Sequence, residues 1–118
     1  MDLKTREAGG VTIVDAPAKI TLGEGASVLR EGLRELASTG HKNILINFGD
    51  VSVLDSTGLG VLVSSFATVG SAGGRLKLCN LGKRVKDVLV LTKLYTVFEV
   101  YDDEATACRS FGPLAAKV

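Results

Sequence analysis

An acid and two hydroxyls, Asp55, Ser56 and Thr57, precede two glycines and a nearly unbroken apolar run that continues to Phe66. They lie where a short apolar segment, expected to be a strand, is followed by a helical pattern. In α/β sheets, ligands and reactive groups usually lie at the carboxyl ends of the strands. A helix that begins near Ser56 or Thr57 leaves free N–H groups there, and Asp55 or Ser56 can cap them. Capping alone therefore explains an acid and a hydroxyl at this position, and any further chemistry needs an additional signal.

Two glycines, Gly58 and Gly60, follow at once in the first turns of the same expected helix. Each glycine inside a helix lowers helix stability by roughly 1 kcal/mol relative to alanine. A cap does not require them. They indicate either that another surface approaches this turn closely or that the helix packs tightly on the sheet.

Three kinds of chemistry fit the stretch "LDSTGLG". A phosphate-binding loop would use the free amides, but the pattern of a P-loop or GxGxxG motif and a nearby lysine are missing, so purine-nucleotide binding is the weaker alternative. A serine hydrolase would need a GxSxG elbow, and its only base, His41, is expected at the other end of the sheet. The third is modification: an exposed hydroxyl between small residues is open to a kinase, and a phosphate adds about −2 charge.

The segments around this stretch alternate between strand and helix patterns. Apolar and β-branched runs predict strands near 3–8, 11–16, 43–48, 75–81 and 97–101. Helical spacing predicts helices within 23–40, 57–69, 83–94 and after 102. The pattern predicts an α/β fold: a central, mostly parallel sheet of about five strands with the first strand at its edge, and about four helices.

The chain has 118 residues, which predicts a single domain over 1–118. Its net charge of +1 gives no case for direct nucleic-acid binding, and the basic residues Lys83, Arg84 and Lys86 are expected on a solvated helix face. Cys79 and Cys108 are expected as small buried side chains in a reducing compartment. The cysteines and the histidine show no metal-ligand spacing, so we expect no metal and no cofactor.

No apolar core of a signal peptide is visible in "MDLKTREAGG". Residues 56–74 lack charge over nearly the length of a membrane span, yet they hold five glycines and six Ser/Thr residues. We expect a buried helix followed by a turn, no membrane contact, and a cytoplasmic protein.

The stretch from residue 53 to 103 strongly resembles the sulfate transporter and anti-sigma-factor antagonist (STAS) domain, most closely its stand-alone bacterial antagonists. The motif "DSTGLG" is the most specific part, and "GGRLKLC" supports it. The resemblance covers almost the whole chain, from "VTIVDA" to the last helix, and so implies a single STAS-like domain.

The resemblance implies a regulatory protein without catalytic residues. A serine kinase that is also an anti-sigma factor would phosphorylate Ser56, with Thr57 as the alternative acceptor. The unphosphorylated form would bind this kinase and release the sigma factor, and a serine phosphatase would reset the cycle. The implied partner-binding residues are Asp55, Ser56, Thr57, Gly58, Leu59 and Glu24, in a monomer or weak dimer. The alternative within this family is a scaffold or sensor domain of a signalling complex.

One departure from the family concerns the entry to the first helix. Many antagonists carry Gly-x-x-Asp there, whereas this chain has "PAKITLGEG". An acidic contact would have to come from Glu24 or be missing. Leu59, with Val61 as a second possibility, is expected to stay partly exposed as the apolar half of the docking surface, and core packing is the alternative for both residues.

Overall fold

Five strands form the central sheet of the computed structural model, which describes residues 3–112. Their order is β1-β2-β4-β6-β7, and only β1 runs antiparallel to its neighbour. The strands are β1 (Lys4–Ala8), β2 (Val11–Asp15), β4 (Asn43–Asn47), β6 (Arg75–Cys79) and β7 (Glu99–Tyr101). The predicted fold class, with the first strand at the edge of a mostly parallel sheet, is confirmed.

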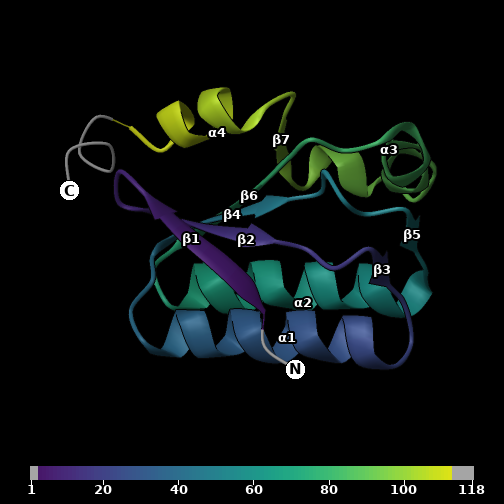
Figure 1. Ribbon diagram of the computed structural model, residues 1–118, viewed down its shortest axis with the longest axis horizontal. Coiled ribbons are helices and arrows are strands. Elements are labelled where there is room, and N and C mark those ends of the chain that lie inside the picture. The colour runs from purple at the N-terminus through teal and green to yellow at the C-terminus, as the bar shows by residue number, and fades with distance from the viewer. Residues whose placement is uncertain (1–2, 113–118) are drawn as a thin grey trace.

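Helices cover both faces of this sheet. α1 (Glu24–Ser38) and α2 (Ser56–Ser71) lie side by side on one face, and α4 (Glu104–Ser110) lies on the other (Figure 1). α3 (Lys83–Leu91) and the short 3-10 helix η1 (Leu94–Thr96) connect β6 to β7. Because both faces are covered, β4 is apolar at successive positions, with Ile44, Leu45 and Ile46 all buried.

A second, small sheet lies next to the start of α2, and the sequence analysis did not predict it. β3 (Lys19–Ile20) pairs in parallel with β5 (Val53–Leu54), in the register Lys19 with Val53 and Ile20 with Leu54. β5 ends one residue before Asp55, and β3 leads into the loop that opens α1. This pair of strands therefore holds the starts of α1 and α2 next to one another.

The uncharged stretch 56–74 forms α2 and a turn, as predicted. α2 buries Val61, Leu62 and Val69 in the larger of two apolar clusters, and Ser65 of the same helix is also buried. The smaller cluster lies under α4 and includes Leu45, Cys79, Ala107 and Phe111. Within residues 3–112, no helix is both long and apolar enough to cross a membrane.

Candidate functional site

Asp55 links three segments at the start of α2. It is the N-cap of α2: its Oδ1 accepts a hydrogen bond from the Gly58 amide at 2.8 Å. Its Oδ2 accepts a second bond, from the Leu22 amide in the β3–α1 loop, at 2.9 Å. The amides of Gly58 and Leu22 hold the pKa of the Asp55 carboxyl below its usual range. Asp55 is thus an ionised cap that also fixes a neighbouring loop.

Ser56 and Thr57 occupy the first two positions of α2. Ser56 is exposed, whereas Thr57 is half-buried. The backbone N–H of a residue at the start of a helix has no partner within that helix, so an exposed hydroxyl lies here beside an ionised carboxylate and free amides. Such a group is open to a modifying enzyme, which is the chemistry that the sequence favoured.

Gly58 packs against the protein's own backbone. The residue is buried, and a Cβ atom there would lie 2.0 Å from the Ile20 carbonyl oxygen of β3 and 2.8 Å from Leu54 Cδ1. Of the two interpretations of this glycine, the structure supports close packing of α2 on the small sheet. The predicted partner contact of Gly58 is corrected accordingly, because β3 already covers the residue.

Gly60 has the opposite environment. It is exposed, and a Cβ atom there would meet no atom within 4 Å. The fold of this chain therefore does not require a glycine at position 60. Gly60, unlike Gly58, remains consistent with the close approach of another molecule.

The remaining predicted docking residues divide between surface and core. Leu59 is partly exposed and packs on the larger apolar cluster, and Glu24 is exposed as the first residue of α1. Val61 is only 3% exposed, so of its two alternatives core packing holds and the docking surface does not. A one-residue uncertainty in the orientation of the helical arc is enough to exchange a core position for a surface position.

Leu22 is a residue of this region that sequence reasoning missed. Its side chain is 79% exposed, and its amide is bonded to Asp55 next to Ser56. A signal was present in the sequence: Leu22 precedes Gly23 in a loop and belongs to no periodic apolar face.

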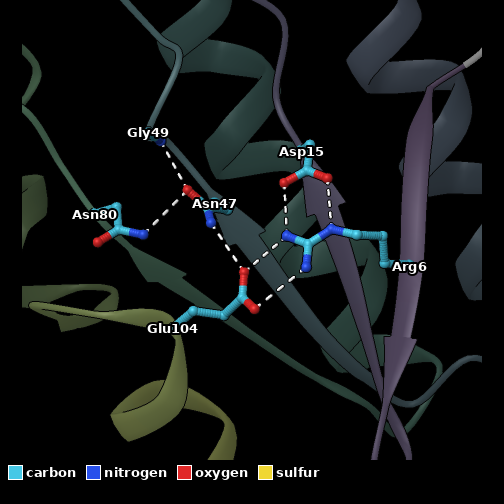
Figure 2. Close-up of polar contacts among 6 residues, drawn as sticks. All are labelled: Arg6, Asp15, Asn47, Gly49, Asn80 and Glu104. Carbon is cyan, nitrogen blue, oxygen red and sulfur yellow. Dashed lines mark hydrogen bonds and ion pairs between the residues drawn. The ribbon is translucent and has the colours of Figure 1, made fainter.

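A second polar cluster ties β1 and α4 to the carboxyl ends of β2 and β4 (Figure 2). The Arg6 guanidinium donates to both carboxylate oxygens of Asp15, at 2.7 and 2.8 Å, and to both oxygens of Glu104, at 2.7 and 3.2 Å. Asn47 donates to Glu104 and accepts from the Gly49 amide and from Asn80. All of these groups are paired with one another, so the cluster is assigned to holding the fold together.

The other chemically capable residues lie away from Ser56. His41 Nδ1 lies 2.8 Å from Thr12 Oγ1, just before β4 begins, whereas Ser56 follows the carboxyl end of that strand. His41 is therefore not placed as a base for Ser56.

Burial raises the pKa of the Cys79 thiol to about 12, which removes the thiolate that redox chemistry needs. The described residues contain no cluster of His, Cys, Asp and Glu that could hold a metal ion.

Ser56 is exposed and lines neither of two grooves that lie elsewhere on the surface. Two grooves of about 600 and 510 Å³ flank Leu3 between β1 and α1, and among the described residues that line them neither Asp55 nor Ser56 appears. At the start of α2, the Asp55 carboxylate also takes the Gly58 amide that a phosphate ligand would need. The occupied amide disfavours a phosphate ligand at this helix start.

Comparison with known proteins gives a consistent result. A family model described as "STAS domain" matches residues 2–107. The anti-sigma-B factor antagonist of Bacillus subtilis is 37% identical over 99 residues, which are 84% of this chain and 81% of that protein. A crystal structure from Thermotoga maritima, described as a candidate anti-sigma factor antagonist, superposes with a TM-score of 0.82 at 27% identity and covers 92% of both chains. The phosphorylated Bacillus cell fate determinant SpoIIAA shares the fold, with a TM-score of 0.70 at 16% identity over 92% of this chain and 98% of that one.

Proposed function

Because the chain belongs to the STAS domain family, we propose that it is an anti-sigma-factor antagonist switched by phosphorylation of Ser56. Unphosphorylated protein binds an anti-sigma factor that is also a serine kinase, and the sigma factor is released. Phosphorylation of Ser56 ends this binding, and a serine phosphatase restores it. The protein has no catalytic role of its own and acts in the cytoplasm. The observation that carries the proposal is the exposed Ser56 hydroxyl at the first position of α2, beside the ionised Asp55.

The surface around Ser56 supports docking of a protein. α2 contains no charged residue, although one of its faces is exposed, and Gly60 and Val63 lie on that face. Exposed helix faces usually carry charged residues. A partner can therefore cover this face without desolvating any charge carried by α2 itself.

The charge at the start of α2 supports a switch by phosphate. Asp55 is ionised, and its oxygens already occupy the amides of Gly58 and Leu22. A phosphate on Ser56 would add about −2 charge at this position. A docked partner would have to remove water from that group, and a desolvated charge without a matched cation costs several kcal/mol. Phosphorylation should therefore weaken docking far more than folding.

Mapping the modified residue tests this proposal. The protein is incubated with the purified anti-sigma-factor kinase of the same organism and ATP, and the phosphate is located by mass spectrometry. We expect it on Ser56, and we expect Ser56→Ala to accept none. Thr57→Ala is the matched control and should still be phosphorylated, because Thr57 is half-buried. Full labelling of Ser56→Ala, with phosphate on Thr57, would refute the assignment.

A further inference from the structure

Leu22 is an exposed apolar side chain on a loop, and among the described residues it packs against neither apolar cluster. It is 79% exposed, whereas the apolar residues of the two core clusters are at most 8% exposed. The loop between β3 and α1 carries it, and within residues 3–112 neither apolar cluster includes it as a packed neighbour. Leucine on such a loop leaves apolar surface in water without stabilising the fold.

The backbone on either side of Leu22 is nevertheless held in place. The Leu22 amide donates to Asp55 Oδ2 at 2.9 Å, and the Asp55 amide donates to the Ile20 carbonyl at 3.3 Å. After the loop, the Ala26 amide donates to the Thr21 carbonyl at 3.2 Å. The close packing of Gly25, where a Cβ would lie 1.8 Å from the Lys19 carbonyl oxygen, fixes the start of α1 on β3. The loop thus presents a free side chain on a fixed backbone.

We propose that Leu22 is the apolar anchor by which this chain is recognised, and that the anti-sigma factor presents an apolar pocket to it. The inference rests on the proposed function and names the chemistry of the partner's contact. Asp55 connects the two halves of the surface: one carboxylate oxygen holds Leu22 in position, and the next residue along the chain is Ser56. A partner that docks over Ser56 therefore meets Leu22 at the same time. Asp55 acts here as a positioning residue.

Burial of Leu22 would contribute much to affinity at little entropic cost. Full burial of an exposed leucine side chain is favourable by an amount equivalent to at least about a tenfold gain in affinity. A preorganised backbone lowers the ordering cost of binding. A partner that instead recognised this loop by charge would depend on Glu24, the acid two residues further on. Recognition through Leu22 predicts a loss of affinity in Leu22→Ala, whereas recognition through charge predicts a loss in Glu24→Ala.

The affinity test uses the purified anti-sigma-factor kinase of the same organism, titrated by calorimetry into unphosphorylated protein. Leu22→Ala should bind at least about tenfold more weakly, Leu22→Asp more weakly still, and Leu22→Met within about threefold of wild type. Leu91→Ala is the matched control, because Leu91 of α3 is 82% exposed, and it should bind as wild type does. All four variants should keep the wild-type melting temperature, since these side chains lie mainly in water.

Two results would overturn the inference. One is an unchanged affinity of Leu22→Ala; a loss in Glu24→Ala beside it would assign recognition of the loop to charge. The other is an equal loss in Leu22→Ala and Leu91→Ala, which would indicate a general effect of exposed apolar area. If wild-type protein itself does not bind the kinase, the proposed function fails instead, so the two failures are distinguishable.

The positioning by Asp55 can be measured without any partner. In hydrogen exchange followed by NMR, the Leu22 amide should exchange more slowly than an unbonded loop amide, and Asp55→Ala should remove this protection. The Thr106 amide, which Asp103 caps at 2.7 Å in α4, serves as the internal reference and should keep its protection in the variant. A Leu22 amide that exchanges freely in the wild type would contradict the proposed positioning.

Discussion

Gly58 and Gly60 show how two identical residues in one motif serve different purposes. Two positions apart on a helix correspond to a rotation of about 200°, so the two residues lie on nearly opposite sides of α2. Gly58 faces β3, where a Cβ would meet the Ile20 carbonyl, and Gly60 faces open space. The sequence indicated that either docking or packing required glycine, but it could not assign one reason to each residue.

Substitution by alanine separates the two glycines. Gly58→Ala should lower the free energy of unfolding by about 1–3 kcal/mol, because the new methyl group displaces β3 or α2. Gly60→Ala should raise it by up to about 1 kcal/mol, because alanine is the better helix former and the site is open. Urea denaturation of both variants measures these effects. Equal stabilities of the two variants would contradict the packing assigned to Gly58.

Sequence analysis could predict the cap of α2 but not the position of Leu22. The motif placed Asp55 and Ser56 at the start of α2, since capping and helical spacing are local properties. The bond from Leu22 to Asp55 joins residues 33 positions apart in the chain, and no periodic pattern contains it. Long-range contacts of this kind become visible only in the folded structure.

At the scale of the elements, α4 is held to the sheet at both of its ends. Arg6 binds Glu104 in the first turn of α4. At the other end, the buried Lys77 donates to the Ser110 carbonyl at 3.1 Å, and Arg75 donates to the Phe111 carbonyl at 2.6 Å. Cations near the last carbonyls also suit the negative end of the helix dipole. A helix of seven residues would be marginal without these contacts.

The Arg6 cluster should give stability that depends on pH. Hydrogen bonds from Arg6 hold the pKa values of Asp15 and Glu104 below their usual 3.8 and 4.5. Stability from groups with lowered pKa values is present above those usual values and is lost as the pH falls through the lower values of the folded state. Arg6→Gln should therefore cost about 1 kcal/mol at pH 7. The difference from wild type should shrink as the pH falls below about 4.

Urea denaturation at several pH values between 2.5 and 7 measures this dependence. Arg109→Gln is the control, because Arg109 bonds only to Thr106 among its described contacts, and the pKa of Asp103 is lowered mainly by hydrogen bonds from Thr106 and least by attraction to Arg109. The loss in Arg109→Gln should be much smaller than that in Arg6→Gln at every pH. A loss in Arg6→Gln that stays constant across this range would show that the guanidinium acts through packing alone.

The elements that the sequence predicted are those with a clear period. Apart from β1 and β7, the strands of the main sheet and the four helices carry apolar spacing over five or more residues, and all of these elements were placed within a few residues of their observed bounds. β3 and β5 have two residues each, which is too short for any period to appear. The small sheet that positions Asp55 therefore could not be predicted, although the residues it positions could.

At the scale of the whole molecule, the start of α2 is tied to the fold by its cap, by Gly58 and by β5, while the Ser56 hydroxyl itself remains exposed. Phosphorylation should therefore leave the fold intact. The open amides of a helix start favour an anion by roughly 0.3–1 kcal/mol, and repulsion by Asp55 opposes this. Phosphorylated and unmodified proteins should give the same circular dichroism spectrum and melt within about 4 °C of each other. A phosphorylated form that loses its cooperative transition would indicate a switch by unfolding.

The central claim is that charge on Ser56 decides whether the partner binds. Calorimetric titration of the purified anti-sigma-factor kinase, without ATP, into four forms of the protein tests it most directly: wild type, phosphorylated Ser56, Ser56→Ala and Ser56→Asp. Wild type and Ser56→Ala should bind equally, Ser56→Asp should bind more weakly, and the phosphorylated form should bind at least about a hundredfold more weakly than wild type. Equal affinities of the phosphorylated and unmodified proteins would contradict the account.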